Sequence, residues 1–392
     1  MKVLFVINSF YTKGNGLCAS ARRTVAKLKE RGLDVKVLSA PNQDKDGPQP
    51  DFVLQSFHLP LFDPLVEKQG YLFAKADKKI IEEAVRWADV VHLEEPFSVE
   101  AKAAKIAKRL GKPCTGTYHL HPENLFASVH LERFKYFNSI TLRIWRDFVF
   151  NHCQIIQCPT ENVKERLSRK RFKAQLRTIS NGLVLEDLVH IEKDNVVPKK
   201  LSDAKYTVIT IGRYSVEKDL KTLLKAMKYA KHSNDIQLVI AGRGPQEKNL
   251  RRYANRLYKK GYIKYPVVFG FYTLDELQQI SAASDLYVHC AYIEVEGLSC
   301  MEAIQIGIVP IIADGGKTAT AQFAMDYMSR FKQKDAKDLA YKIDYWLANE
   351  DKRKEEAKKY TSIGRDYDIE DSIDKLIEMF NDAIEMKKIT HK

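Results

Sequence analysis

Short apolar runs alternate with longer amphipathic stretches along the whole chain. The first half has runs at about residues 2–7, 34–39, 89–93, 113–118, 154–158 and 176–180, and the second half has runs at about 207–211, 237–241, 266–270, 285–289 and 308–313. Short runs rich in β-branched residues predict buried strands, and the stretches between them predict helices. The alternation predicts an α/β protein with two doubly wound parallel sheets.

Two of the predicted helices show a buried face. Residues 19–31 place Ala21, Val25 and Leu28 on one side of a helix. The last helix, at about residues 370–387, has an apolar face at helical spacing that consists of Ile373, Leu376, Ile377, Phe380 and Ile384.

A turn at Asn181-Gly182 separates the two series of strands. We therefore expect an N-terminal domain at residues 1–187 and a C-terminal domain at residues 188–367. Residues 368–392 remain as a separate helical segment.

The composition is that of a globular protein of 392 residues, with 45% hydrophobic and 29% charged residues. No apolar stretch approaches the roughly 18 residues of a transmembrane helix, and the first apolar run is too short for a signal peptide. Six cysteines without C-x-x-C spacing are typical of reduced thiols, so we expect a cytoplasmic protein. Lys and Arg number 64 against 51 Asp and Glu, and the net charge of +13 favours an acidic partner.

The segment from Glu294 to Gly307 carries the clearest candidate chemistry. Glu294 and Glu302 lie on either side of Gly297, where the missing side chain would let a ligand approach the backbone. Ser299 and Glu302 have the spacing of a capping box, which predicts a helix that runs to Gly307 with Glu302 in its first turn. The N–H groups at the start of such a helix favour a phosphate. Alternatively, Glu302 only caps the helix and Glu294 is a solvated loop charge.

This segment resembles the E-x7-E signature of the retaining glycosyltransferases of family 4, and further blocks resemble that family in the same order. The blocks are G-R-x-x-x-E-K at 212–218, Gly242-Arg-Gly244-Pro245, Val268-Phe-Gly270-Phe271, Ala283-Ser-Asp285-Leu286 and the strand at 307–313. The resemblance implies the GT-B fold, in which two Rossmann-like domains face a cleft. It also implies that the helix at 368–392 crosses back to the N-terminal domain.

The resemblance gives roles to four residues of the second half. Arg213 and Lys218 would neutralise the diphosphate of a nucleotide sugar, which needs positive charge. Glu302 would bind the ribose and Glu294 the donor sugar. The nucleotide base would lie near Phe271 and its neighbour Tyr272.

A pair of histidines follows the strand predicted near residue 117. By resemblance His119 contacts the donor sugar near the reacting carbon, and His121 could take this role if the loop register differs. A single strand-end histidine is more often structural. The expected catalytic residues are His119, Glu294, Arg213 and Lys218.

Gly14-Asn15-Gly16 opens the first helix, where the backbone could approach the donor or the acceptor. The stretch also fits G-x-G-x-x-A, which raises a dinucleotide-binding oxidoreductase as an alternative. That fingerprint needs the strand to run straight into the glycines and an acid about 20 residues later, and both features are missing. The donor-binding candidates are Gly14, Gly16, Arg213, Lys218, Phe271, Glu294, Gly297, Leu298, Ser299 and Glu302.

Basic and aromatic residues concentrate at residues 132–177. Eleven Lys and Arg residues face four acidic residues there, an excess of seven positive charges. A basic, aromatic-rich helix is typical of proteins that bind an anionic membrane surface, and Trp145 and Phe148 are expected to insert. Alternatively, the aromatic residues fill the core and the arginines stay solvated. No nucleic-acid motif accompanies the charge, so we expect no nucleic-acid partner.

The resemblance, together with the basic segment, implies a retaining glycosyltransferase that moves a sugar from a nucleotide diphosphate sugar, with a UDP-hexose as the expected donor, to a hydroxyl of a membrane glycolipid or lipid-linked saccharide. It would act at the inner face of the cell membrane. The nucleotide sugar is a co-substrate, and we expect no cofactor or metal, because the E-x7-E type needs none. The alternatives are a soluble or polysaccharide acceptor, and a catalytically silent basic membrane-binding protein.

Overall fold

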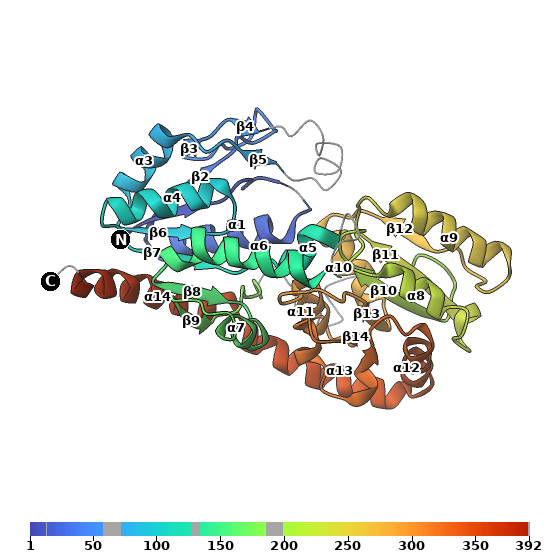
Figure 1. Ribbon diagram of the computed structural model, residues 1–392. Coiled ribbons are helices and arrows are strands. Elements are labelled where there is room, and N and C mark those ends of the chain that lie inside the picture. Colours follow the sequence, from blue (N-terminus) through green and yellow to red (C-terminus); the bar gives the residue numbers. More distant parts are fainter. Residues whose placement is uncertain (13, 58–71, 128–133, 186–198, 391–392) are drawn as a thin grey trace. The chain divides into compact units, whose positions relative to one another are not determined.

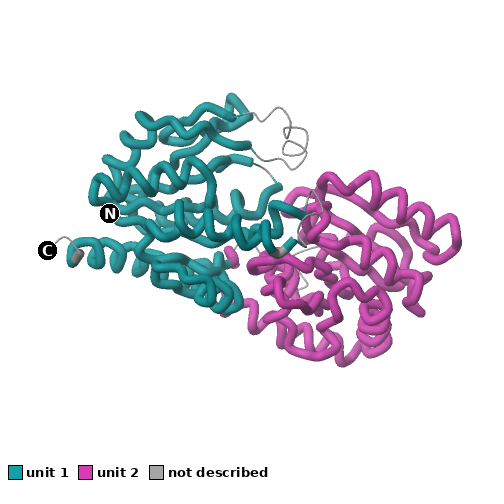
Figure 2. Tube along the Cα trace, in the orientation of Figure 1, with its two compact units in different colours: residues 1–182, 369–392 teal, residues 183–368 magenta. Residues whose placement is uncertain are grey.

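The computed structural model describes residues 1–12, 14–57, 72–127, 134–185 and 199–390 (Figure 1). The chain divides into two compact units (Figure 2). Unit 1 consists of Met1–Gly182 and Ile369–Lys392, and unit 2 consists of Leu183–Asp368. Unit 1 therefore contains both ends of the chain.

Unit 1 is built on a parallel sheet of seven strands in the order β3-β2-β1-β6-β7-β8-β9. The strands are β1 (Lys2–Val6), β2 (Asp34–Ser39), β3 (Phe52–Val53), β6 (Val90–Leu93), β7 (Cys114–Thr117), β8 (Ile155–Cys158) and β9 (Gln175–Thr178). A separate antiparallel pair joins β4 (Ser56–Phe57) and β5 (Phe73–Ala74). The six strands predicted in this half are confirmed. The sequence pattern misses β3, because two residues are too few to show a period.

The helices of unit 1 connect these strands. They are α1 (Gly16–Glu30), α3 (Lys78–Trp87), α4 (Ser98–Arg109), α5 (Pro122–Ala127), α6 (Lys135–Phe148), α7 (Glu161–Ser168) and the short η1 (Phe150–His152). α1 begins three residues before the predicted range, because the Asn15 side chain caps it by accepting from the Leu17 N–H at 3.0 Å. Ala21, Val25 and Leu28 are buried as predicted.

α14 (Ile369–Thr390) adds the C-terminal end of the chain to unit 1, where it packs on α1, β6 and β7. Its buried face consists of Ile369, Ile373, Leu376, Met379, Phe380 and Ala383. Ile377 and Ile384, predicted on this face, are only half-buried at its edges. Arg31 at the end of α1 forms ion pairs with Glu370 at 2.6 Å and Asp374 at 2.9 Å.

Unit 2 is built on a parallel sheet of six strands in the order β12-β11-β10-β13-β14-β15. The strands are β10 (Tyr206–Ile211), β11 (Ile236–Ala241), β12 (Val268–Gly270), β13 (Leu286–His289), β14 (Val309–Asp314) and β15 (Arg330–Lys332). The five strands predicted here are confirmed. The sixth, β15, is a short edge strand with one buried side chain, so it shows no apolar run.

Among the helices of unit 2, α8 contacts α9 and α12, and α13 contacts α11 and α12. The helices are α8 (Leu220–Ala226), α9 (Glu247–Lys259), α10 (Leu274–Ala282), α11 (Leu298–Gln305), α12 (Ala336–Ala348) and α13 (Glu350–Gly364). Four short 3-10 helices are η2 (Ser233–Asp235), η3 (Thr320–Phe323), η4 (Tyr327–Ser329) and η5 (Arg365–Tyr367).

One apolar core surrounds the sheet of unit 2 and includes Tyr287, Phe331 and Trp346. All six cysteine side chains of the protein are buried. Among the described helices, none combines the length and the apolar character that crossing a membrane requires.

Candidate functional site

The loops at the carboxyl ends of the unit 2 strands, together with α11, carry most of the donor-site candidates. Arg213 and Lys218 follow β10, Phe271 follows β12, and Glu294 follows β13. The carboxyl ends of parallel strands lie at one edge of a sheet, and open α/β sheets bind ligands there. Candidates from distant parts of the sequence therefore share one edge of unit 2.

Glu294 is the centre of a polar cluster at this edge. Its Oε2 atom accepts a hydrogen bond from Lys218 Nζ and lies 3.6 Å from His289 Nε2. His289 ends β13, and its Nδ1 lies 3.1 Å from the Tyr287 hydroxyl, which is 3.0 Å from Ser299 Oγ. The cluster thus links the loop after β10, the end of β13 and the first turn of α11.

The Glu294 carboxyl is held in its ionised form. Burial alone would raise its pKa, but the charge of Lys218 and the hydrogen bond from His289 bring this pKa well below its ordinary value. Burial lowers the pKa of His289, and the hydrogen bond to Glu294 opposes this. About a fifth of the Glu294 side chain, 19%, remains exposed. A carboxylate in this setting can accept hydrogen bonds from hydroxyl groups of a ligand.

Gly297 makes the turn from the Glu294 loop into α11. Its φ of +99° lies in the left-handed region that favours glycine. A Cβ atom at this position would lie 2.4 Å from Thr320 Oγ1. The Thr320 hydroxyl donates to the Glu296 carbonyl at 3.1 Å, so it is fixed in this position. Position 297 therefore needs glycine for its backbone conformation and for the space that Thr320 occupies.

The capping box predicted at Ser299 and Glu302 is wrong. α11 begins at Leu298, and its N-cap residue is Gly297, which has no side chain to cap with. Ser299 is the second helical residue, and its hydroxyl pairs with Tyr287. Glu302 consequently lies in the second turn, not the first, and its side chain is half-buried. The S-x-x-E spacing is present, but the left-handed glycine starts the helix earlier.

Phe271 lies at the same edge and exposes 56% of its surface. The Arg243 guanidinium lies 4.4 Å from the centre of its ring, a geometry suited to cation–π attraction. Tyr272 and Arg213 are half-buried. An exposed ring at this edge offers a face on which a flat group can stack.

In unit 1, His119 follows β7 and Glu94 follows β6. His119 Nε2 lies 2.5 Å from Glu94 Oε2, and His92 Nε2 lies 3.2 Å from the other carboxylate oxygen. Burial would raise the pKa of Glu94, but the charges and hydrogen bonds of His119 and His92 lower it to about 2. The buried Glu94 carboxylate therefore holds the His119 ring in one orientation.

His121, the alternative to His119, is fully buried, and its Nδ1 lies 3.2 Å from the Tyr118 hydroxyl. The His119 side chain is 7% exposed. Burial therefore favours His119 as the histidine that a ligand can reach.

Gly14 and Gly16 lie at the start of α1 and are exposed. Gly14 has a φ of +77°, which lets the chain turn into the helix. The Asn8 amide, which follows β1, donates to the buried Glu100 carboxyl group at 2.9 Å. The hydrogen bond joins the end of β1 to α4.

Side chains of the basic segment form ion pairs with acidic residues elsewhere in unit 1. Arg166 binds the buried Glu123 at 2.7 Å, and Arg177 pairs with Asp382 of α14. The predicted excess of seven charges therefore overstates the net charge of this surface, because it counts acids of the segment alone. Of the acids and bases counted there, Glu132 and Arg133 lie outside the described residues.

The aromatic residues of α6 divide between two faces. Trp145, expected to insert into a membrane, is instead buried in unit 1 with 4% exposure. Phe148 is exposed as expected. The exposed apolar residues on and beside α6 are Phe134, Tyr136, Phe137, Ile144 and Phe148.

His289 and Glu94 are among the residues of these clusters that sequence reasoning misses. Each ends or directly follows a central strand, so the position of a polar residue at a strand end could have identified them. Each also contacts a candidate residue that the sequence does identify: His289 lies by Glu294, and Glu94 binds His119.

Two protein-family models match the chain. The model described as Glycosyltransferase Family 4 matches residues 14–187, and the model described as Glycosyl transferases group 1 matches residues 192–364. The matched residues take in most of both units. The chain belongs to glycosyltransferase family 4. Its predicted family membership is therefore confirmed.

Relatives of this glycosyltransferase differ in what their names say they transfer. The alpha-monoglucosyldiacylglycerol synthase of Streptococcus pneumoniae is 24% identical over 327 residues, which are 80% of this chain and 71% of that protein. A GDP-mannose-dependent alpha-mannosyltransferase of Corynebacterium glutamicum is 25% identical over 320 residues, 79% of this chain and 72% of that protein.

Solved structures show the same fold as this glycosyltransferase. HepE of Anabaena, solved in complex with UDP and glucose, has a TM-score of 0.73 at 15% identity. The match covers 97% of this chain and 100% of that chain. The predicted GT-B fold, with two Rossmann-like parallel-sheet domains, is confirmed.

Proposed function

We propose that this glycosyltransferase moves a hexose from a UDP-sugar to a hydroxyl of a membrane lipid, with retention of the anomeric configuration and without a metal ion. The observation that carries the proposal is the cluster of Glu294, Lys218 and His289 beside the start of α11. It combines an ionised acceptor for sugar hydroxyls with positive charge for phosphate.

The donor diphosphate would lie between Lys218, Arg213 and the N-terminal end of α11. An ammonium group has three donors, so Lys218 can keep its bond to Glu294 and still donate to a phosphate oxygen. The helix start adds a partial positive charge. These groups would stabilise the charge that develops on the departing nucleotide diphosphate, which is the role of a divalent ion in metal-dependent enzymes.

Glu294 of unit 2 would contact the reacting sugar, and His119 keeps the donor-sugar role that its resemblance to the family implies. The Nε2 atom of His119 is occupied by Glu94, so Nδ1 is the nitrogen available to the sugar. The acceptor hydroxyl would attack the face that the nucleotide leaves, and a donor phosphate oxygen would take its proton. Neither the Glu294 nor the Glu94 carboxylate is needed as a nucleophile.

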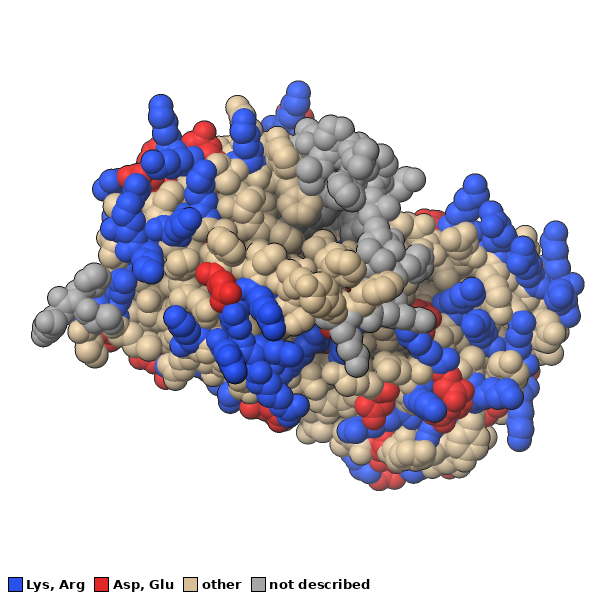
Figure 3. Space-filling model, in the orientation of Figure 1, with Lys and Arg blue, Asp and Glu red and all other residues tan. Residues whose placement is uncertain are grey.

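Two observations support a lipid acceptor. The exposed apolar row on and beside α6 includes Tyr136 at 74% and Phe148 at 56% exposure. In Figure 3 the surface over α6 is mostly tan, the colour of residues that carry no Lys, Arg, Asp or Glu side chain. Lys and Arg, in blue, gather over the neighbouring α7. Apolar residues next to basic ones suit an anionic membrane surface. The relative from Streptococcus pneumoniae is named for a diacylglycerol product.

The test is a donor and acceptor screen with the purified protein. UDP-glucose, UDP-galactose, UDP-GlcNAc and GDP-mannose are compared for hydrolysis, then for transfer to diacylglycerol in vesicles and to a soluble glycan. We expect a UDP-hexose and the vesicle acceptor to be used, an α-linked product by NMR, and full activity in excess EDTA. Hydrolysis of GDP-mannose alone would overturn the UDP-sugar donor, and transfer only to the soluble glycan would overturn the lipid acceptor. Loss of activity in EDTA that Mg²⁺ restores would overturn metal independence.

The matched variants are Glu294→Ala and Glu217→Ala. Both glutamates lie in unit 2 at the same strand edge, but only Glu294 joins Lys218 and His289, whereas Glu217 accepts from the neighbouring Ser215. Turnover should fall at least about a hundredfold for Glu294→Ala, the scale of one lost transition-state contact. An equal loss in both variants would point to a structural effect.

A further inference from the structure

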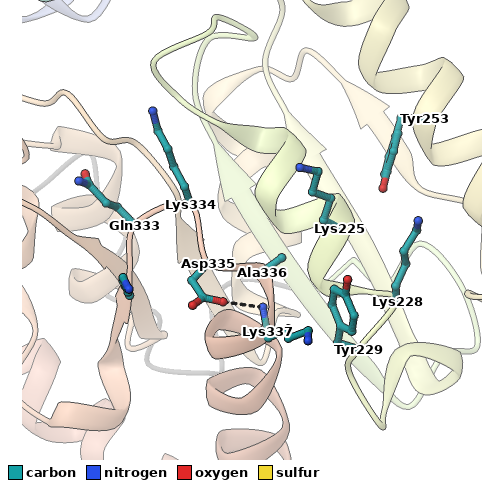
Figure 4. Close-up of a pocket in the computed structure, with 10 residues that line it drawn as sticks. Lys225, Lys228, Tyr229, Tyr253, Gln333, Lys334, Asp335, Ala336 and Lys337 are labelled. Carbon is teal, nitrogen blue, oxygen red and sulfur yellow. Dashed lines mark hydrogen bonds between the residues drawn. The ribbon is translucent and has the colours of Figure 1, made fainter. Parts of the chain in front are cut away.

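A hollow of about 480 Å³ opens on the surface of unit 2 between α8, α9 and the start of α12 (Figure 4). This volume is in the range of small-molecule sites. Half of the ten lining residues are lysines, and Asp335 is the only acidic one. The lysines are Lys225, Lys228, Lys332, Lys334 and Lys337. None of the donor-site candidates lines it.

Two acidic residues near this lysine pocket, Asp335 and Asp338, are engaged with the backbone. Burial raises the pKa of a third, Asp219, and the nearby charges of Lys334 and Lys225 oppose this shift. The Asp335 carboxylate caps α12 by accepting from the N–H groups of Lys337 and Asp338, at 3.0 and 3.1 Å. The Asp338 carboxylate accepts from the Lys332 N–H at 2.7 Å. Among the described residues, no carboxylate forms an ion pair with any of the five lysine side chains. The pocket therefore concentrates positive charge, because its five lysines outnumber the nearby acidic residues Asp219, Asp335 and Asp338.

Tyrosine rings orient three of these ammonium groups. Lys334 Nζ lies 3.7 Å from the ring centre of Tyr292, and Lys337 Nζ lies 5.6 Å from that of Tyr229. Lys228 Nζ lies 5.7 Å from the ring centre of Tyr253. Cation–π contacts hold an ammonium group in place without neutralising it. Figure 4 shows Lys225 and Lys228 at the end of α8 and Lys334 on the segment that leads into α12.

We propose that this lysine pocket binds a phosphate ester, at a site separate from the nucleotide-sugar site. A phosphate group carries up to two negative charges and several acceptor oxygens, and lysines bind it as point charges. Several ammonium groups drawn together repel one another, so an anion bound among them relieves an unfavourable interaction. The phosphate could belong to a phosphorylated small molecule or to a phospholipid headgroup.

The test is lysine acetylation footprinting of the whole protein, read by mass spectrometry. Sodium pyrophosphate, phosphatidic acid vesicles and phosphatidylcholine vesicles are the three probes. Lys259, Lys260 and Lys358, which are exposed residues of unit 2 outside the pocket, are the internal controls. We expect severalfold slower acetylation of Lys225, Lys228 and Lys334 than of the controls when a phosphate probe is bound.

The three probes distinguish a phosphorylated small molecule from a phospholipid headgroup as the source of the phosphate. Protection by pyrophosphate supports a soluble phosphate ester, and protection by phosphatidic acid vesicles alone supports a lipid headgroup. Equal acetylation of pocket and control lysines with all three probes would overturn the proposal.

A variant series tests the same site by affinity for the protecting probe. Lys225→Gln with Lys228→Gln and Lys334→Gln should weaken binding at least about tenfold, because each lysine near a charged surface contributes roughly fivefold. The control series Lys259→Gln, Lys260→Gln and Lys358→Gln removes the same charge. Equal weakening in both series would mean attraction by net charge only. Donor hydrolysis should be unchanged in the pocket series.

Discussion

At the level of single residues, the donor-side chemistry depends on contacts between loops that are far apart in the sequence. Lys218 and Glu294 are 76 residues apart and form one ion pair. Their resemblance to family blocks identifies both, but nothing in the spacing shows that they touch. His289 is not predicted for a related reason. Its position beside Glu294 depends on how the loop after β13 folds back, and the spacing of apolar residues in the sequence does not show this.

Glu302 is the residue proposed to bind the ribose, and its variant tests that role directly. Glu302→Ala should weaken nucleotide affinity by about 1.5–3 kcal/mol, the scale of a hydrogen bond to a charged group. Glu302→Gln keeps the shape and one acceptor oxygen, so it should lose less. Calorimetry with UDP is the measurement. If wild type and Glu302→Ala bind equally well, the assignment is wrong.

Glu94 offers a prediction in pH. Its pKa in the folded protein, about 2, lies below the ordinary value of 4.5, so the ionised carboxylate stabilises the fold above about pH 4.5. This contribution is lost as the pH falls from about 4.5 towards 2. Glu94→Gln should therefore lower the Tm at pH 7, and its difference from wild type should shrink over that window.

The control for this experiment is Glu165→Gln, which breaks an exposed pair with Arg169. Exposed pairs contribute little, so its Tm should stay near that of wild type at every pH. A difference between Glu94→Gln and wild type that is the same at pH 3 and pH 7 would contradict the account of the buried carboxylate.

At the level of elements, apolar runs predict every central strand of both sheets. The pattern misses β3, which is only two residues long, and β15, which has one apolar residue between two basic ones. The edge strand β12 is equally short but is predicted, because it lies in a continuous apolar run. The pattern also misplaces the start of α11. The S-x-x-E spacing there has the right chemistry, but the backbone turn at Gly297 decides where the helix begins. Tertiary contacts such as the hydrogen bond from Thr320 to the Glu296 carbonyl hold this turn, and the local spacing does not record them.

Gly297→Ala tests this turn. A Cβ in the left-handed region costs roughly 1–2 kcal/mol, and the contact with Thr320 adds to it. The double variant Gly297→Ala with Thr320→Ala should recover the steric part only. Gly316→Ala is the control, because a Cβ there meets nothing within 4 Å. Urea unfolding measures all four proteins, and equal stability of Gly297→Ala and Gly316→Ala would refute the argument.

α6 makes a separate prediction about membranes. Tyr136→Ser with Phe148→Ser should reduce binding to anionic vesicles, above all the part that resists high salt, since that part comes from apolar insertion. Tyr258→Ser with Tyr341→Ser removes two exposed aromatic residues from unit 2 and serves as the control. Co-sedimentation at low and high salt is the measurement. If the variant with Tyr136→Ser and Phe148→Ser binds anionic vesicles as well as wild type does, the exposed apolar residues of α6 do not bind the membrane.

At the level of the whole molecule, the chain completes unit 1 only with its last helix. Phe380 of α14 is fully buried, and its ring centre lies 5.3 Å from that of His92 in β6. Phe380→Ala should cost about 3–5 kcal/mol, whereas Ile389→Ala, at a position 73% exposed, should cost almost nothing. Hydrogen exchange should become faster in unit 1 and stay unchanged in unit 2. Faster exchange in both units would contradict the division at residues 182 and 368.

The return of α14 to unit 1 has a consequence for biosynthesis. As a ribosome makes this chain, unit 1 emerges first, but the residues that complete it come last. Between them stand the residues from Leu183 to Asp368, which take roughly ten to forty seconds to translate at ~5–20 residues per second. During that interval the surface of β6 and β7 that α14 covers is open to solvent or to a chaperone. Unit 1 therefore begins to leave the ribosome before unit 2 but is completed after it.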